Sequence, residues 1–370
     1  MAVEFMNAAE LTSILQVLVP ERTMDDIVFT ELMRPRAIGQ QIILVEQRDS
    51  FYNYTPARVA GTSFSQLNRE SKGRFTLEAV QYGEDKPMDE KFMLMSRQMG
   101  TFGTPVDLTE EQMNDQLNLI DRMITRLKKI TWDLFTTGTY KALGANGELI
   151  GTDSYNFGQL TAAVDWSNWA SATPLADMRN WKLQHRGSSV FFDNRAKLFM
   201  QSTDVNNMLN NQNQTDLGAR LKFIPGYGTR TLNLADVNSI FLAMDLPQVV
   251  EYDESYNTQA VNFNTSFPLA TGGGPFPYTM FIPAGTAVLI GARRYGDPVC
   301  DYTMTPTLPQ ALGMSGIPTG VTESDSPWSN IYMDFDIDLK DKWAARSRIA
   351  FAGAPRVLFP SAIYKVNLQP

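Results

Sequence analysis

The feature that most constrains this sequence is one long helical pattern in its first half. Thr109 is followed by two glutamates and then Gln112, which is the spacing of a capping box with Thr109 as the cap. Apolar side chains then recur at steps of three and four residues, as on one face of a helix; they are Met113, Leu117, Ile120, Ile124, Leu127 and Leu134. Gly138 is a suitable stop. The pattern predicts one helix over about 107–137, a rod of roughly 42 Å at about 1.5 Å per residue, with its apolar face against a sheet.

The residues at the start of the chain, 1–45, have the pattern of an arm rather than of a domain. One short apolar stripe includes Leu11, Ile14 and Leu15, and we expect Pro20 to end it. A stripe this short buries little apolar surface by itself. It therefore needs a neighbouring surface, which is either its own domain or another subunit.

Residues 46–100 are predicted to form a long two-stranded ribbon. Phe51–Ala60 supplies one strand and Arg74–Tyr82 the other, and a polar linker from Gly61 to Gly73 joins them. This linker is too long for a tight hairpin turn. Because an isolated two-stranded ribbon is only marginally stable in water, we expect this one to lie on something else.

The rest of the chain is predicted to be mainly strands and irregular loops, which makes the fold class α+β. Tyr140–Pro174 is loop-rich, Asp177–Gln184 belongs to a second, shorter helix, and Asn206–Asn213 is expected to be a surface loop. Ile331–Leu339 alternates apolar and polar residues as a half-buried strand does. The other predicted strands are Ser188–Phe192, Ile240–Met244, Gln248–Tyr252, Tyr278–Ile282, Thr286–Ile290, Arg346–Phe351 and Ala362–Leu368.

Charge and composition argue against several functions. The net charge is -8, and the basic residues occur only as isolated pairs, so a phosphate-binding surface is not expected. The longest unbroken apolar run, Ile240–Met244, is far shorter than the roughly 20 residues that span a bilayer. The single cysteine, Cys300, and the single histidine, His185, lie far apart and outside any catalytic signature. Neither an enzyme nor a cofactor is expected.

Three carboxylates, Asp334, Asp336 and Asp338, share one face of the strand predicted near the C-terminus. Such a set could hold Ca²⁺ or Mg²⁺. The spacing is not that of an EF-hand loop, because Leu339 stands where glycine is needed. A solvated or salt-bridged face, with Lys340, Lys342 and Arg346 as partners, is the favoured interpretation.

The order of these features resembles a known capsid fold. An arm, a long ribbon, a long helix, a short helix, a glycine- and proline-rich β region and a returning strand follow one another, as in the HK97-like subunits of tailed-phage capsids. Five stretches in order are also similar to the phage lambda type major capsid protein family, known as protein E. They are Phe135–Tyr140 with Gly144–Gly147, Tyr155–Gly158, Trp166–Trp169 with Pro174–Met178, Val250–Tyr256 and Phe281–Ile290.

The resemblance covers the chain from about residue 10 to its end and implies a division into named parts. These are the N-terminal arm 1–45, the extended loop 46–100, the peripheral domain 101–190 with the spine helix, the axial domain 191–335, and C-terminal strands 336–370 that return to the peripheral domain. Contacts between subunits are expected from the arm and the ribbon. The candidate residues are Leu11, Ile14, Leu15, Arg58, Phe64, Leu67, Arg69, Lys72 and Arg74.

The function that the resemblance implies is that of a major head protein. Its copies would assemble as hexamers and pentamers into an icosahedral shell around the double-stranded DNA of a tailed phage, without sequence-specific binding. The other partners implied are a portal protein, a separate scaffolding protein, since no scaffolding-like segment precedes the arm, and optionally a decoration protein. The location that the resemblance implies is the virion, which would be assembled in the host cytoplasm. The alternatives are another HK97-fold shell, a tail assembly protein, or a hydrolase with an uncharted site.

Overall fold

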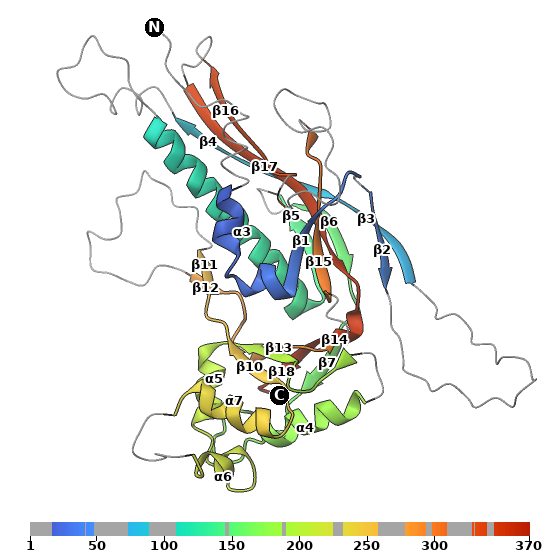
Figure 1. Ribbon diagram of the computed structural model, residues 1–370, viewed down its shortest axis with the longest axis vertical. Helices are drawn as coiled ribbons and strands as arrows, with labels where there is room; N and C mark the ends of the chain where they lie inside the picture. Colours follow the sequence, from blue (N-terminus) through green and yellow to red (C-terminus); the bar gives the residue numbers. More distant parts are fainter. Residues whose placement is uncertain are drawn as a thin grey trace, which may run out of the picture.

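The structure, a computed structural model, contains two five-stranded sheets in its described part, with one long helix lying across the first (Figure 1). It describes residues 17–40, 42–47, 73–88, 109–144, 148–186, 190–224, 232–257, 278–293, 298–308, 328, 330–338 and 344–370. Within them the chain is an α+β fold, as the sequence predicts.

The first sheet is built around one long strand, β17 (Ala344–Val357). β17 pairs antiparallel with β4 (Val80–Met88) along one edge, and along its other edge first with β16 (Tyr332–Asp338) and then with β15 (Cys300–Thr305). β1 (Met33–Ala37) adds parallel to β15. A short π-helical segment, η1 (Val28–Leu32), leads into β1.

The predicted long helix is confirmed as α3 (Thr109–Thr137), a single continuous helix that packs mainly against β17. Ile120, Ile124 and Leu127 of the predicted face are buried, whereas Met113 and Leu117 are half-buried. Gly138 ends the helix in the left-handed conformation, with φ of 74°, and donates its N–H to the Leu134 carbonyl at 2.8 Å.

The capping role predicted for Gln112 is wrong. Its side chain is 1% exposed and continues the buried stripe of α3, as does Gln116 one turn later at 3%. Within the described residues, neither amide has a hydrogen-bond partner. The core face of α3 therefore changes from apolar side chains to two amides at its N-terminal end.

The second sheet has the strand order β10 (Gln248–Glu251), β9 (Lys197–Met200), β13 (Thr286–Ile290), β18 (Ile363–Asn367) and β7 (Gly158–Thr161). Four helices accompany it: α4 (Pro174–Gln184), α5 (Ser202–Leu209), α6 (Leu217–Leu221) and α7 (Leu234–Ala243). A second apolar core, which includes Trp166, Phe241 and Leu289, fills the space between them. β17 passes into β18 through a short 3₁₀ turn, η3 (Pro360–Ala362), and so connects the two sheets.

Four two-stranded ribbons complete the described fold. They are β2 (Ile42–Gln47) with β3 (Gly73–Glu78), β5 (Thr139–Leu143) with β6 (Leu149–Ser154), β8 (Val190–Phe191) with β14 (Ala292–Arg293), and β11 (Ser255–Asn257) with β12 (Tyr278–Met280). The predicted helix behind Pro174 is confirmed by α4, and the predicted strands near residues 250, 280, 290, 335, 350 and 365 are confirmed by β10, β12, β13, β16, β17 and β18.

One local prediction about a strand is wrong. Ile240–Met244 is not a strand but the end of α7. That helix begins with a capping box, because the Asn233 side chain accepts from the Asp236 N–H and the Asp236 carboxylate accepts from the Asn233 N–H. The segment from Tyr140 to Pro174 is loop-rich, as predicted, but it also holds three short strands, β5, β6 and β7.

Two further predictions are also wrong, one for the segment Asn206–Asn213 and one for Pro20 near the start of the chain. Asn206–Asn213 is partly helix α5, and Asn211 is 3% exposed because its amide bonds to backbone groups of Ala172 and Gly218. Pro20 does not end the first helix, since residues 17–23 are helical.

Candidate functional site

The β2–β3 ribbon is a separate two-stranded sheet, and it packs against β17 beside the first sheet (Figure 1). Its strands are antiparallel, with Glu46 opposite Arg74, and the two side chains form an ion pair at 2.8 Å. One face buries Ile43, Val45 and Leu77 against Ala354 of β17. Ile42 on this ribbon is 61% exposed. The base is therefore anchored on the central strand of the first sheet.

The structure places only Arg74 of the predicted contact residues. The others, in the arm and beyond the ribbon's base, lie outside the described residues; they are Leu11, Ile14, Leu15, Arg58, Phe64, Leu67, Arg69 and Lys72. The predicted partner strand of Arg74–Tyr82, Phe51–Ala60, also lies outside the described residues. Gly73–Glu78 pairs with Ile42–Gln47, and Val80 onward leaves the ribbon to pair with β17.

The acidic row predicted near the C-terminus lies on β16 and is paired with arginine. Arg348 of β17 reaches Asp336 at 3.2 Å and Asp334 at 4.0 Å. Arg346, which was an expected partner, instead faces Asp85 of β4 at 3.9 Å. No cluster of three metal-ligating side chains exists in the described part of the chain. The salt-bridged interpretation of the row therefore has the support of its geometry.

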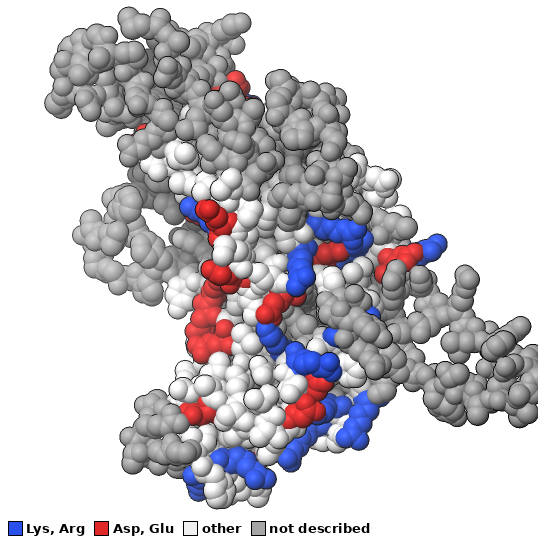
Figure 2. All heavy atoms as spheres, viewed as in Figure 1, with Lys and Arg blue, Asp and Glu red and all other residues white. Residues whose placement is uncertain are grey.

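Charges of both signs are interspersed over the surface. On the face seen in Figure 2, Lys and Arg lie among Asp and Glu rather than in one continuous basic surface. Several cations are held in ion pairs, as Lys182 is with Asp245 at 2.6 Å. Binding the phosphate backbone of a nucleic acid requires clustered cations that can release counterions. This face does not offer such a cluster. No described helix is both long and apolar enough to cross a bilayer.

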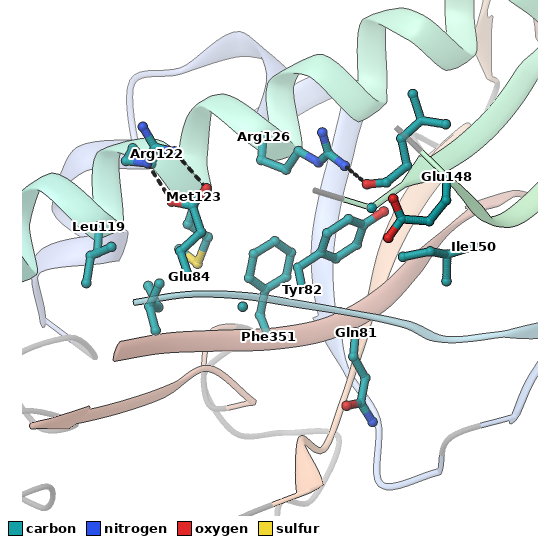
Figure 3. Close-up of a pocket in the computed structure, with 14 residues that line it drawn as sticks. Gln81, Tyr82, Glu84, Leu119, Arg122, Met123, Arg126, Glu148, Ile150 and Phe351 are labelled. Carbon is teal, nitrogen blue, oxygen red and sulfur yellow. Dashed lines mark hydrogen bonds and ion pairs between the residues drawn. The ribbon is translucent and has the colours of Figure 1, made fainter. Parts of the chain in front are cut away.

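A groove of about 410 Å³ lies where α3, β4 and the tip of the β5–β6 ribbon meet (Figure 3). Leu119 and Met123 of α3 form one wall, Tyr82 of β4 and Phe351 of β17 form the floor, and the tip closes the far side (Figure 3). The Tyr82 and Phe351 rings are stacked with their centres 5.0 Å apart. The tip contributes Leu143 and Ile150, which are 45% and 58% exposed.

The polar groups at this groove are already engaged with one another. Arg122 holds Glu84 by two hydrogen bonds, of 2.5 and 2.8 Å. Arg126 donates to the Leu143 carbonyl at 3.1 Å and lies over the Tyr82 ring. The hydroxyls of Tyr82 and Tyr140 are 2.6 Å apart, and burial raises the pKa of both above the ordinary value for tyrosine. The Arg122 and Glu84 charges at the rim are thus paired with each other, and the Glu148 side chain also lines the groove, beside Tyr82 and Ile150 (Figure 3).

Cys300 and His185 do not meet. The Cys300 thiol on β15 is fully buried in the core beneath α3, and burial raises its pKa well above the ordinary value, so a reactive thiolate is disfavoured. His185 follows α4, where its ring packs against Phe192 and Tyr364 of the second core. The geometry therefore offers no nucleophile and base pair from these two residues.

The arrangement of these elements defines a class of fold. A long helix across a sheet, a projecting two-stranded ribbon, and a central strand that continues into a second helix-flanked sheet make up the HK97-like capsid fold. No family model matches the sequence, and no curated protein matches it.

Two solved structures are similar to this chain in fold. A phage-related protein from Bordetella bronchiseptica RB50 has a TM-score of 0.52 and 9% identity, over 96% of this chain and 96% of that chain. A prophage protein of E. coli CFT073 assigned as a capsid protein has a TM-score of 0.51 and 12% identity, over 98% of this chain and 99% of that chain. What is shared with both proteins is the fold.

Proposed function

We propose that this chain is a shell-building subunit, the major capsid protein of a tailed phage, and that it has no enzymatic activity of its own. The observation that carries the proposal is the β2–β3 ribbon, on a chain with the HK97-like fold. One face of this ribbon is buried on β17, while its other face leaves Ile42 61% exposed. Its natural use is to overlap a neighbouring subunit.

The anchoring of the ribbon fits this role. Ile43, Val45 and Leu77 fix its base on β17, so the direction in which it leaves the body is set by the first sheet. Closed shells repeat a contact between different surfaces of identical copies, related by rotation. A projecting element with a rigid base can supply such a contact, because every copy then presents it at the same angle.

The surface charge supports enclosure rather than binding of DNA. With a net charge of -8 and cations in ion pairs, a wall made of this chain would not hold phosphate by counterion release. We propose that the shell encloses double-stranded DNA without sequence-specific contacts. Cys300 and His185 do not support the hydrolase alternative, since they lie in separate cores.

The finer parts of the proposal rest on the sequence motifs. The similarity to the phage lambda type supports assembly as hexamers and pentamers in the host cytoplasm, with a portal, a separate scaffold and optionally a decoration protein as partners. We assign the name peripheral domain to the sheet beneath α3 and axial domain to the second sheet. On that assignment β15 is peripheral, although the boundaries expected from sequence would place it in the axial domain.

Deletion of the ribbon tip tests the proposal. The chain lacking Thr62–Lys72 should stay folded, by circular dichroism and thermal unfolding, but should not form stable shells in electron micrographs. The control is Lys182→Gln, which breaks the partly exposed ion pair with Asp245 beside the second sheet; such a pair contributes at most about 1 kcal/mol, and its loss should leave assembly intact. Spherical particles of normal stability from the deletion would overturn the role of the ribbon. If the full chain gives only a small, uniform oligomer under assembly conditions, the proposed function itself is wrong.

A further inference from the structure

The groove between α3, β4 and the β5–β6 tip leaves large aliphatic side chains in contact with water. Leu143, Leu149 and Ile150 are 45%, 56% and 58% exposed, and all three belong to one small ribbon. Single exposed apolar residues are common on proteins, but a group beside an apolar groove marks an interaction surface. The tip therefore has the character of a contact that is completed by another chain.

The backbone at the floor of the groove is also available. Within the described part of the chain, β4 pairs only with β17, so its other edge is open. An open edge presents N–H and C=O groups that an extended segment can pair with. Glu84, Asp85, Lys86 and Pro87 guard the later part of this edge with charge and with a residue that cannot donate. The part without such protection, Val80–Gly83, is the part that lines the groove at Gln81, Tyr82 and Gly83.

The charges of the groove decide what kind of partner fits. Both guanidinium groups are engaged, Arg122 with Glu84 and Arg126 with the Leu143 carbonyl and the Tyr82 ring. A nucleic-acid backbone or an acidic peptide would need free cations, and would have to break these contacts first. An extended segment with apolar side chains meets the Tyr82–Phe351 floor and the aliphatic tip without disturbing any ion pair.

We propose that the groove is an assembly contact, which receives an extended apolar segment of a second copy of this chain beside the open edge of β4. The inference rests on the proposed function, because a shell subunit repeats one contact between unlike surfaces on every copy. It adds a receiving site to the proposal, with Leu143 and Ile150 as the residues that determine its affinity.

A double variant tests the receiving site. Leu143→Ser with Ile150→Ser removes two exposed side chains, so the unassembled subunit should keep its thermal unfolding temperature. The protein concentration needed for half-maximal shell assembly should rise about tenfold or more, since apolar burial between copies is lost. The matched control is Leu183→Ser with Leu242→Ser, which removes two side chains that are 47% and 51% exposed elsewhere and should assemble as the unaltered chain does.

Photo-crosslinking identifies the occupant. A benzoylphenylalanine at position 150 should give a dimer-sized product in assembled shells, and mass spectrometry should find the crosslinked peptide in a second copy. Crosslinks only within one chain, or only to a different protein, would overturn the proposal, as would equal loss of assembly in the groove variant and its control. If shells of the unaltered chain form while the groove variant assembles normally, the groove proposal fails and the proposed function stands. If the unaltered chain forms no shells, the proposed function fails.

Discussion

Arg122 on the long helix and Glu84 on the edge strand form a two-pronged pair, with Nη2 2.8 Å from Oε1 and Nε 2.5 Å from Oε2. Hydrogen bonding to the carboxylate raises the pKa of Arg122. Because the two side chains are 61% and 45% exposed, the pair adds little to stability. Its geometry matters more, since it fixes α3 over β4 at one end of the groove and leaves the remaining edge of β4 accessible.

The buried face of α3 gives the first prediction. Ile120 is 1% exposed, so Ile120→Asp would place an unpaired charge in the core, which costs several kcal/mol (about 3 or more). We expect insoluble or unfolded protein. Asn118→Asp, two residues away on the exposed side, is the control and should remain soluble. Soluble, assembly-competent protein from the Ile120→Asp variant would show that this face is not core.

At the two buried amides near the N-terminal end of the same face, we expect a substitution to have the opposite effect and to stabilise the protein. Gln116 is 3% exposed and its amide has no hydrogen-bond partner within the described residues. Gln116→Leu should therefore raise the free energy of unfolding by about 1–3 kcal/mol, because an unsatisfied buried polar group is removed. Urea unfolding of the unassembled subunit measures it. Asn118→Leu, which is exposed, should give no gain, and a destabilised Gln116→Leu would contradict the prediction.

Asp204 predicts a dependence of stability on pH. Its carboxylate, in the first turn of α5, accepts the Gly285 N–H at 2.9 Å, and burial, with a smaller effect of Asp165, raises its pKa from 3.8 to about 6. Between these two values the folded protein binds the proton more tightly than the unfolded chain does. Folding should therefore become less favourable as the pH rises through this window.

Asp204→Asn removes that dependence while it keeps an oxygen that can accept from Gly285. Thermal unfolding at several pH values should show the variant gaining on the unaltered chain from about pH 4 to about pH 6, with a constant difference above that range. A difference that does not change with pH would rule out titration of Asp204.

Asp245 has an unusual backbone conformation and forms an ion pair with a nearby lysine. Its φ is 54°, in the left-handed region after α7, and its carboxylate meets the Lys182 ammonium at 2.6 Å. Asparagine tolerates this conformation, so Asp245→Asn should lose at most about 1 kcal/mol from the exposed ion pair. A β-branched residue does not, and Asp245→Val should cost about 1–3 kcal/mol more. Equal unfolding temperatures for the two variants would argue against backbone strain at this position.

The only cysteine and the only histidine should be dispensable for function. Cys300 is fully buried, so Cys300→Ala avoids the unpaired hydroxyl that serine would place in the core. Together with His185→Gln it should still give phage that package DNA, with a modest loss of stability. Complementation measured by plaque formation is the test. Intact shells that fail to package would indicate a chemical role for one of the two residues.

The long helix could be predicted because its signal is local. A period of three to four residues persists from Met113 to Leu134, and one glycine after it fixes the end. β16 was predictable for the same reason, since alternation with Ile331 and Met333 inward needs no knowledge of the partner strand. The short apolar run Ile240–Met244 was ambiguous, and the capping box at Asn233 decided it for a helix.

The groove and the ribbon's pairing could not be predicted, because they depend on contacts between distant segments. Tyr82, Met123, Ile150 and Phe351 meet only after β4 has paired with β17 and α3 has packed across them. Leu143 and Ile150 belong to a stretch predicted as loop, where exposed aliphatic residues carry no signal. The strand partner of Gly73–Glu78 depended on the register between two segments far apart in the chain, and the polar linker did not specify that register.

The fourteen residues of β17 have a mechanical consequence. The strand is hydrogen-bonded to β4, β16 and β15 along its length and leads through η3 into β18 of the other sheet. A force that pulls the two sheets apart along β17 loads those hydrogen bonds in shear, so that many must rupture together, whereas a peeling force would open them one by one. β17 can thus act as a tension member, and the molecule should resist stretching along this strand far better than bending across it.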